Sequence, residues 1–430
     1  MKSRAGAYAL VAIVSLAAFA ISLASGLIYD DNVLLFERLK PQSVNGFAEF
    51  WQENYWGDYH DSGLYRPLGL TLSYAEKSLF GSHPAPYHAV SLLLYIGACL
   101  AAFWLLSDLF PMSIALAAAL LFAAHPIHAE AAATLYGQLD SAASLFVFLT
   151  LIAWRRGLLL ISLPLCFAAL CFKETAIITP LLAILIAPRW KLAASFSIPI
   201  GAYLGLRWKA LGSLLLPEHS TFMHDYSLVL RIKVWIVTLG EAIRSSVAPW
   251  AQTVYYGHLR DELLGRPYAD ALWILTGIGA LWMLYAALER KYFILGAAWF
   301  VIAFLPMSNL LPTGVIFAER SMFLPVLGAA ILAASLIERA NTRGRYVLAS
   351  LLIVGLVLAN RTAWTWRNEE SLWRTTIADH PTSPYAHAAL GWALIQTNPQ
   401  EAGEHFRDAL QLNPTMPEAL RGLQRLNGAQ

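Results

Sequence analysis

The sequence predicts an all-α polytopic membrane protein that carries a short helical module at its C-terminal end. Of its 430 residues, 58% are hydrophobic and 13% are charged, which is more apolar surface than one soluble core can bury. Apolar runs long enough to cross a bilayer, about twenty residues, recur along the chain. After Ala363 the pattern changes to polar helical segments broken by prolines. These observations predict a membrane domain over residues 1–364 and a separate module over residues 365–430.

Hydropathy indicates about eleven transmembrane helices, several of them short. The segments lie near Tyr8–Ile28, Pro86–Leu106, Ser113–Ala124, Thr134–Trp154, Leu158–Phe172, Ala176–Ala187, Leu192–Leu206, Ala271–Leu288, Phe293–Leu305, Met322–Ile337 and Tyr346–Ala363. The first follows Lys2 and Arg4 and could be a signal peptide. Its apolar run exceeds the ~7–15 residues of a signal core, so we expect a retained helix.

Short basic loops indicate the orientation. If the N-terminus is cytoplasmic, the loops on the same side hold Arg155, Arg156, Arg189, Lys191, Arg290, Lys291, Arg339, Arg343 and Arg345, as the positive-inside rule requires. Residues 29–85, residues 208–270 and the C-terminal module then face outward. The segment Arg231–Trp250 is apolar but contains Glu241 and Arg244. A full span there would invert every later loop, so we expect an interfacial or re-entrant helix.

Charge and cysteine usage exclude two classes of function. The formal net charge of +2 gives no clustered basic face, so we expect no nucleic-acid partner. Cys99, Cys166 and Cys171 all fall in apolar segments without metal-type spacing. We therefore interpret them as buried thiols rather than as disulfides or zinc ligands.

The C-terminal module has the pattern of a tetratricopeptide (TPR) repeat. Pro381 and Pro414 are separated by close to the repeat length of about 34 residues. Between them, "AALGWAL" and "AGEHFRDAL" fall where the two helices of a repeat belong. So short an array is expected to lean on the membrane domain, because stacked repeats bury one another's apolar faces. The module could be a peptide-docking surface or only a capping structure.

Polar residues gather on the outward side. Charge at the membrane edge is costly and therefore marks candidate functional residues. These side chains could line an outward cavity holding both signs of charge, and they are Asp30, Asp31, Tyr65, Arg66, His125, His128, Glu130, Asp140, Lys173, Glu174, Glu319 and Arg320.

Each candidate also has a structural interpretation. The two aspartates could simply end the first helix in water. Lys173 with Glu174, and Glu319 with Arg320, could be local ion pairs. The stretch "HPIHAE" could bind a metal through His125 and His128. Pro126 interrupts a helix there, so a hydrogen-bonded helix start is the alternative.

Five motifs in order carry a family resemblance: "YDD", "LYRPLGLTL", "HPIHAEAAATLYGQLD", "CFKETAIITP" and "FAERSMFLP", followed by the TPR-like tail. The chain resembles the transmembrane-and-TPR (TMTC) O-mannosyltransferases, which have the GT-C glycosyltransferase fold, and their bacterial relatives. Two features depart from the family: the TPR array is short, and the family's "GRAD" appears as "GQLD", Gly137–Asp140.

The resemblance implies transfer of a sugar from a polyprenyl-phosphate carrier, with inversion, at the non-cytoplasmic face. The acidic pair would supply the general base, Asp31 being slightly preferred to Asp30. The departing phosphate would be held by Arg320, Lys173 and Arg66, with Glu319 beside them. The sugar or acceptor would be bordered by His125, His128, Glu130, Asp140, Glu174 and Tyr65. No cofactor is implied with certainty; a divalent metal ion, if this chain uses one, would be bound by Asp30, Asp31, His125 and His128.

The resemblance favours mannose as the sugar and a Ser/Thr hydroxyl of an exported polypeptide as the acceptor. We expect an enzyme of the bacterial inner membrane, with its site and tail on the periplasmic or exoplasmic side. A lipid or polysaccharide acceptor is the alternative within the same chemistry. A transporter or a non-catalytic assembly factor are the alternatives outside it.

Overall fold

The structure is a computed structural model that describes residues 2–39, 46–57, 62–217, 227–250, 277–278, 282, 285, 290–309 and 314–428. Every regular element in these residues is a helix. The first part of the chain forms α1 (Lys2–Phe19), η1 (Ala20–Ala24), α2 (Asp30–Asn32), η2 (Val33–Arg38), α3 (Gly46–Glu49), α4 (Pro67–Phe80), α5 (Pro84–Leu109), α6 (Met112–Ala123), η3 (Pro126–His128), α7 (Ala129–Ala133) and α8 (Gln138–Arg155).

The remaining elements complete the bundle and the tail. They are α9 (Leu159–Phe172), η4 (Glu174–Ile178), α10 (Thr179–Ile186), α11 (Trp190–Ala193), η5 (Ala194–Phe196), α12 (Ser197–Leu211), α13 (Leu228–Val247), α16 (Arg290–Phe304), η7 (Leu305–Met307), η8 (Glu319–Met322), α17 (Phe323–Arg339), α18 (Asn341–Thr365), α19 (Glu369–Asp379), α20 (Pro384–Leu394), α21 (Pro399–Leu412) and α22 (Pro417–Gly428).

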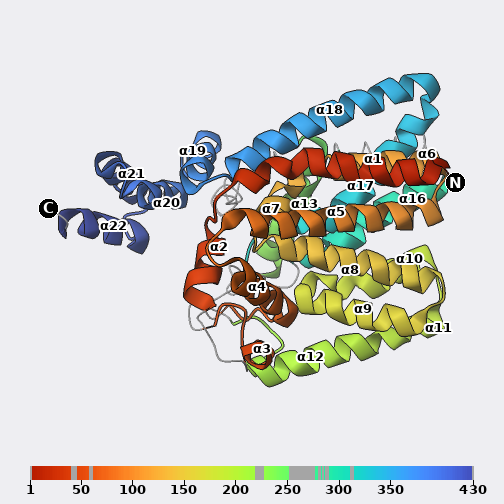
Figure 1. The fold of residues 1–430 in the computed structure, drawn as a ribbon, viewed down its shortest axis with the longest axis horizontal. Helices are drawn as coiled ribbons and strands as arrows, with labels where there is room; N and C mark the ends of the chain where they lie inside the picture. Colours follow the sequence, from red (N-terminus) through yellow and green to blue (C-terminus); the bar gives the residue numbers. More distant parts are fainter. Residues whose placement is uncertain are drawn as a thin grey trace.

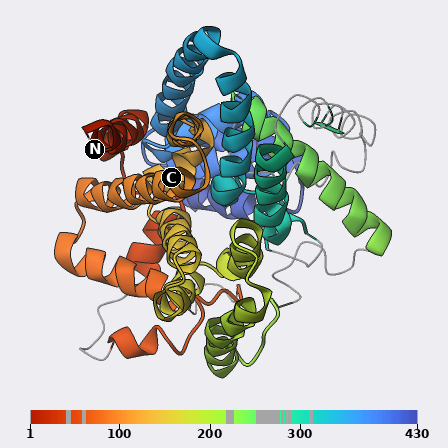
Figure 2. The same ribbon diagram turned by 90° about the vertical axis from the view of Figure 1, so that its right-hand side faces the viewer.

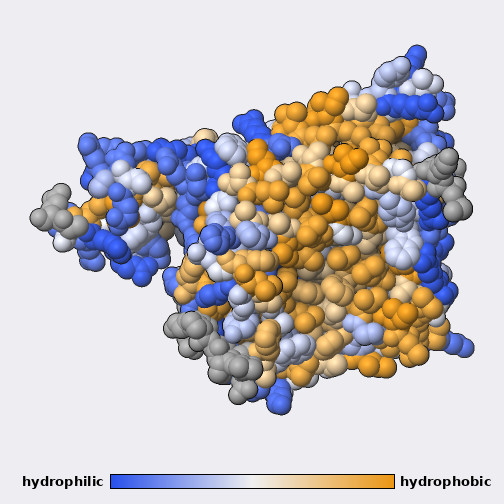
Figure 3. Space-filling model, in the orientation of Figure 1, coloured by the Kyte–Doolittle hydropathy of each residue, from blue (hydrophilic) through white to orange (hydrophobic). Residues whose placement is uncertain are grey.

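The long helices run side by side as a bundle from which the tail α19–α22 projects (Figure 1; end-on in Figure 2). In the described residues, four helices are long and apolar enough to cross a membrane, and a fifth span is possible if α6 and the segment Pro126–Ala133 are one helix bent by 52°. Hydrophobic side chains cover most of the face of the bundle that Figure 3 shows, whereas the tail is mostly hydrophilic. The predicted all-α membrane fold is confirmed.

The predicted segments fall on helices wherever the structure describes them. The segment Ala271–Leu288 lies almost wholly outside the described residues. Most of the ambiguous segment Arg231–Trp250 lies in α13, which is not among the described helices apolar enough to cross a membrane. Glu241 and Arg244 pair with each other one turn apart on this helix, so their charges are compensated locally.

The two ends of the bundle differ in charge. At the end where α1 begins, Asp108 lies 3.7 Å from Arg4 and 3.1 Å from Arg156, and hydrophilic side chains cover this end in Figure 3. The acidic pair of α2 lies at the opposite end, beside the tail (Figure 1). The basic loops and the candidate functional residues are thus separated by the length of the bundle.

Close helix packing depends on small residues at one crossing. A Cβ atom built on Gly296 of α16 would lie 3.1 Å from the carbonyl oxygen of Gly328 on α17, and one on Gly328 would lie 2.5 Å from the carbonyl oxygen of Gly296. Only glycine permits this approach, which is a common way for membrane helices to pack in lipid. The crossing supports η8 and α17, which carry Arg320 toward the site.

The tail helices have strong sequence signals for their starts. Asn368, Ser383 and Asn398 each accept a hydrogen bond from a backbone N–H of the first turn, which is the preferred chemistry of a helix N-cap. Proline follows directly at the start of α20 and α21, where its missing N–H costs nothing. Phe406 is fully buried between these helices and α22. The tail is therefore a compact stack of helices.

Candidate functional site

The acidic pair lies in a turn that the rest of the bundle holds in place. Asp31 is fully buried, and its Oδ1 accepts hydrogen bonds from the backbone N–H groups of Leu135 (2.9 Å) and Tyr136 (3.0 Å). Burial raises the pKa of Asp31 to about 8, although these two hydrogen bonds oppose the rise. Asp31 thus joins the end of the first helix to the turn that precedes α8.

Asp30 is placed differently from its neighbour. It is half-buried, and the described groups that act on its carboxylate do so through their charges rather than through hydrogen bonds. Burial raises the pKa of Asp30 to about 6; Arg320 and Arg66 oppose the rise, and Glu130 adds to it. A partly exposed carboxylate with a pKa near neutrality is well suited to accept a proton from a substrate.

Arg320 forms an ion pair with Glu130. The guanidinium Nη1 donates to Glu130 Oε1, and the backbone N–H of Arg320 donates to Glu130 Oε2 over 3.1 Å. Tyr136 completes this group, since its hydroxyl donates to Glu130 over 2.9 Å and its ring lies 5.2 Å below the guanidinium. The alternative of a local pair between Glu319 and Arg320 is not observed, since Arg320 pairs with Glu130 instead. Glu319 is buried and lines a neighbouring cleft.

The other two predicted cations are also paired over long sequence distances. Lys173 donates to both carboxylate oxygens of Asp140 at 2.6 Å, and both side chains are only 5% exposed. Arg66 makes a two-bond contact with Glu174, at 2.9 and 2.6 Å. The alternative of a local pair between Lys173 and Glu174 is therefore wrong.

These pairs form one electrostatic cluster, which we call the charged site: Asp30, Arg66, Glu130, Asp140, Lys173, Glu174 and Arg320. Arg320 interacts electrostatically with Asp30 and Asp140 as well as with Glu130. Arg66 interacts with Asp140 as well as with Glu174. Segments from five predicted motifs thus meet at one end of the bundle, and each ion pair joins two different segments.

The two histidines of "HPIHAE" lie apart from this chemistry. His125 Nδ1 accepts from the backbone N–H of Ile127 (3.3 Å), and its Nε2 lies 3.1 Å from the carbonyl oxygen of Ser246. The hydrogen-bonded helix start, rather than a metal cluster, is therefore the observed role of His125. His128 is fully buried against aromatic rings, and neither ring nitrogen has a hydrogen-bond partner in the described part of the chain.

The four residues that would bind a divalent metal ion, if the chain uses one, do not lie together as a set of ligands. Asp30, Asp31, His125 and His128 include no three side chains close enough to share an ion; among the described residues, the single group that meets this condition lies in the tail. Tyr65 is likewise structural, since it is fully buried and its hydroxyl donates to the carbonyl oxygen of Trp51 over 2.9 Å.

The tail rests directly on the turn that carries the acidic pair. Glu369 Oε1 accepts from the backbone N–H of Tyr29 (3.2 Å) and from Asn32 Nδ2 (3.4 Å). The hydroxyls of Tyr385 and Tyr29 are 3.4 Å apart, and the rings of Trp373 and Tyr29 are 5.6 Å apart. The expectation that the short array leans on the membrane domain is confirmed.

Tyr29 has a backbone conformation that needs this support. Its φ of 50° lies in a region that bulky residues rarely adopt, at a cost of about 1–3 kcal/mol. Tyr29, Tyr136 and Glu369 are not among the site residues that the sequence predicts. Tyr29 and Tyr136 could have been found from their places inside two of the motifs, but nothing in the sequence indicates that Glu369 contacts residues about 340 positions earlier.

Two hollows adjoin the charged site. One is bordered by Asp140 and Ser321. The other lies between the membrane helices and α19. We call it the tail cleft, and its lining is Trp250, Glu319, Leu358, Arg361, Thr362, Thr365, Trp366, Thr375, Thr376 and Asp379. Its hydroxyl-rich wall leads from the tail to the residue next to Arg320.

Known proteins similar to this chain were identified by sequence. The protein O-mannosyl-transferase Tmtc1 of Drosophila melanogaster is 26% identical over 93% of this chain and 60% of its own length. The mouse protein O-mannosyl-transferase TMTC4 is 25% identical over 92% of this chain and 65% of its own. The human protein O-mannosyl-transferase TMTC1 is 26% identical over 97% of this chain and 56% of its own.

The chain therefore spans about three fifths of the length of these relatives. No family model matches the sequence. Among solved structures, ArnT from Cupriavidus metallidurans bound to undecaprenyl phosphate is 15% identical, with a TM-score of 0.47, over 98% of this chain and 77% of that one. Over more than nine tenths of its length, the chain is similar to the protein O-mannosyl-transferases of the TMTC group, the family that its motifs resemble.

Proposed function

We propose that the chain is a glycosyltransferase that moves a monosaccharide, expected to be mannose, from a polyprenyl-phosphate carrier to a Ser/Thr hydroxyl of an exported polypeptide. The observation that carries this proposal is the position of Asp30: a half-buried carboxylate lies within electrostatic range of the paired cation Arg320 and of Arg66. The names of the relatives support the same chemistry.

Asp30 is the general base in this mechanism. Its carboxylate takes the proton of the acceptor hydroxyl while the hydroxyl oxygen forms a bond to the anomeric carbon. The bond between that carbon and the phosphate oxygen breaks on the opposite face, and its electron pair leaves on the phosphate. The configuration at the anomeric carbon is inverted because attack and departure occur on opposite faces.

Asp31 has a positioning role. Its Oδ1 is used by two backbone N–H groups, and the raised pKa of about 8 keeps its carboxyl largely protonated at neutral pH. This assignment reverses the slight preference for Asp31 as the base, which sequence alone suggested. Asp31 holds Tyr136, and Tyr136 in turn contacts the Glu130–Arg320 pair.

The cations stabilise the departing phosphate. Arg320 is the first candidate because its side chain remains 21% exposed while it is paired, and because a guanidinium matches phosphate geometry. Lys173 is enclosed with Asp140, and Arg66 is held by Glu174. Fixed charges that are already oriented need little reorganisation when negative charge develops. The proposed mechanism has no step that uses a metal.

The tail helices, residues 365–430, act in this proposal as a TPR-type module that guides the polypeptide acceptor. The tail cleft lies beside α19 and reaches Glu319, next to Arg320. Its threonines and the facing Arg361 and Asp379 offer hydrogen bonds to an extended peptide backbone. The direct contact of Glu369 with Tyr29 places the module beside Asp30. These contacts favour a polypeptide over a lipid acceptor.

The site faces the non-cytoplasmic side in this proposal, and the membrane is the bacterial inner membrane. The separation of the two ends supports the first part, because the basic loops lie at the end opposite the charged site. By the positive-inside rule the basic end is cytoplasmic.

The test of the function is a comparison of exported proteins by glycopeptide mass spectrometry. Three strains are compared: one with the intact gene, one without it, and one that expresses Asp30→Asn at the same membrane level. We expect hexose on Ser/Thr peptides only in the first strain. Unchanged exported proteins together with an altered glycolipid or polysaccharide would refute the polypeptide acceptor, and no change in any glycan would refute the enzyme.

The guiding role of the tail cleft has its own test. Thr375→Trp fills the cleft, so we expect a higher KM for a peptide acceptor and an unchanged rate with a small alcohol. A substitution of similar size on the exposed face of the tail, Glu404→Trp, serves as the control. Equal effects on both acceptors, or none on the peptide, would show that the cleft does not guide it.

A further inference from the structure

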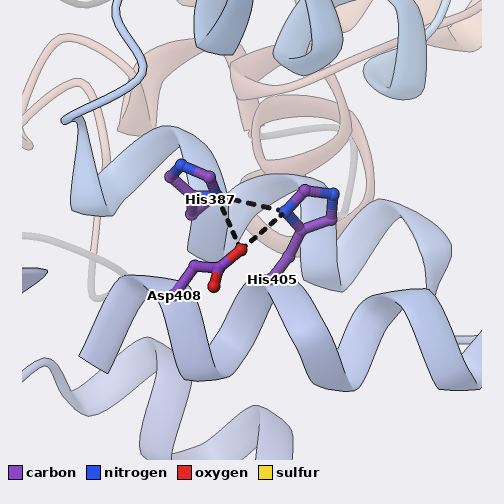
Figure 4. Close-up of side chains that lie close together, drawn as sticks. All are labelled: His387, His405 and Asp408. Carbon is purple, nitrogen blue, oxygen red and sulfur yellow. Dashed lines mark hydrogen bonds and ion pairs between the residues drawn. The ribbon is translucent and has the colours of Figure 1, made fainter. Parts of the chain in front are cut away.

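A second group of reactive side chains lies in the tail, away from the charged site. His387 of α20 faces His405 and Asp408 of α21 (Figure 4). The two Nδ1 atoms are 3.1 Å apart, and Asp408 Oδ2 lies 3.7 Å from His387 Nδ1 and 3.8 Å from His405 Nδ1. Three atoms that bind metals well therefore converge on one point between two helices.

The surrounding hydrogen bonds direct the nitrogen lone pairs toward this point. His387 Nε2 lies 3.1 Å from the carbonyl oxygen of Pro381, which can only accept, so Nε2 carries the proton of the neutral ring and Nδ1 has the lone pair. On His405, the carboxylate of Glu401 lies 3.9 Å from Nε2 and favours a proton there. Partners on the outer nitrogen are the usual way in which proteins orient histidine ligands.

The distances fit a small ion. A tetrahedral metal that is bound at about 2.0–2.1 Å separates its ligand atoms by about 3.3–3.4 Å. The observed separations of 3.1, 3.7 and 3.8 Å bracket that value, so small rotations of the side chains would complete the geometry. Two imidazole nitrogens and one carboxylate oxygen suit Zn²⁺, whereas Mg²⁺ and Ca²⁺ prefer oxygen alone.

Burial and charge also suit a cation. His387 is only 8% exposed, but the side chain of Asp408 is 47% exposed, so water can reach the open side and supply a further ligand. Arg374, whose charge acts on His405, is paired with Glu370 and Glu401.

We propose that the tail binds one divalent transition-metal ion, with Zn²⁺ the best fit, through His387 Nδ1, His405 Nδ1 and Asp408 Oδ2. The ion joins α20 to α21 and so stabilises a helical stack too short to bury many of its own faces. This site is independent of sugar transfer, because none of its three ligands belongs to the charged site.

The test uses the full chain in detergent, prepared without a histidine tag and treated with a chelator. Zn²⁺ binding is measured by calorimetry, and Co²⁺ binding by its visible absorption. The variants are His405→Ala and Asp408→Asn, with Glu404→Gln as the matched control: it removes the same charge as Asp408→Asn, on the same helix, at an exposed position outside the cluster.

We expect the wild-type chain and Glu404→Gln to bind one more equivalent of metal than His405→Ala. Asp408→Asn should weaken that equivalent by about 10–100-fold or more. Zn²⁺ should raise the melting temperature of the wild-type chain and of Glu404→Gln, but not of His405→Ala.

Three results would overturn the proposal. If His405→Ala binds as many equivalents as the wild-type chain with the same affinities, the histidines form only a hydrogen-bonded pair. If Glu404→Gln loses the ion as completely as Asp408→Asn, charge rather than ligation explains binding. If Co²⁺ spectra of the wild-type chain and His405→Ala coincide, no imidazole from this cluster is a ligand. Helical circular dichroism of each variant establishes that a loss of metal is not a loss of fold.

Discussion

Two arginines at opposite ends of the bundle make the same two contacts in different surroundings. Arg156 lies 3.1 Å from Asp108 and 4.5 Å from the centre of an aromatic ring, and these two charged side chains are 40% and 20% exposed. Arg320 pairs with Glu130 and lies 5.2 Å from an aromatic ring, but here the exposed fractions are 21% and 3%.

Burial determines how much each of the two ion pairs contributes to stability. An exposed ion pair stabilises a protein by about 0–1 kcal/mol. For a buried pair, the cost of removing both charges from water offsets most of the attraction. The pair at Arg320 is therefore a poor stabilising device, whereas a fixed charge within electrostatic range of Asp30 is what the proposed reaction requires. Removing equivalent groups at the two ends tests this difference.

The largest contrast is expected between the two arginines themselves. We predict that Arg320→Gln lowers the rate of sugar transfer by about 10²–10³-fold, because a fixed cation opposite the departing phosphate is lost. Arg156→Gln should leave the rate unchanged. Initial rates in proteoliposomes with a polyprenyl-phosphate sugar donor measure both. Equal losses would mean that the charged site has no special role.

Breaking the most enclosed pair should have the next largest effect, this time on stability. Lys173→Met leaves the buried Asp140 without its partner and should lower the free energy of unfolding by about 3–5 kcal/mol. The double variant Lys173→Met/Asp140→Leu should recover much of this loss, because no unpaired charge remains. Reversible unfolding in mixed micelles gives both values. A double variant no more stable than the single one would contradict the explanation.

The sequence predicted where the charged site lies but not how its members pair. The apolar runs located the helices, and the motifs located nearly every member of the cluster. The pairing could not be predicted because neighbouring residues do not face one another. Lys173 pairs with Asp140 and Glu174 pairs with Arg66, so each partner is supplied by a segment brought near only by the fold. The same holds for Arg320, which pairs with Glu130.

The contact between the tail and Tyr29 also could not be predicted from the sequence. Helical periodicity predicted the tail and its need for support, but a repeat pattern does not specify which surface gives that support. The spacing of histidines in the sequence predicted a metal site at the wrong place. His125 and His128 have a ligand-like separation in sequence, whereas the observed cluster joins His387 to His405 across two helices.

A buried acid near the charged site should have a smaller, pH-dependent effect. Glu76 is 2% exposed, its Oε2 accepts from Gln138 over 2.8 Å, and burial raises the pKa of Glu76 to about 8 from 4.5. The folded state therefore holds a proton that the unfolded state releases. This contribution is full below about pH 4.5 and is lost as pH rises through about 8, by at most about 1.4 kcal/mol per pH unit.

Glu76→Gln removes this dependence. We predict that the free energy of unfolding of the wild-type chain falls relative to that of the variant between pH 4.5 and 8. Above that range, the free energies of unfolding of the two proteins should change with pH at nearly the same rate. Unfolding in mixed micelles across pH gives the difference curve. Parallel curves over the whole range would show that Glu76 is ionised in the folded protein.

The smallest effect is expected at the basic end. Asp108→Asn removes the partner of both Arg4 and Arg156, yet these pairs are exposed, so the free energy of unfolding should change by less than about 1 kcal/mol. The same unfolding measurement applies. A loss comparable with that of Lys173→Met would mean that burial does not distinguish the two ends.

The most direct measurement compares sugar transfer by Asp30→Asn and Asp31→Asn. If Asp30 is the base, Asp30→Asn should lose about 10²–10⁴-fold in rate. Asp31→Asn should retain most of it, because the amide oxygen can accept the same two backbone hydrogen bonds and the native carboxyl, with a pKa of about 8, is already largely protonated at neutral pH. Transfer that persists in Asp30→Asn but disappears in Asp31→Asn would contradict this assignment.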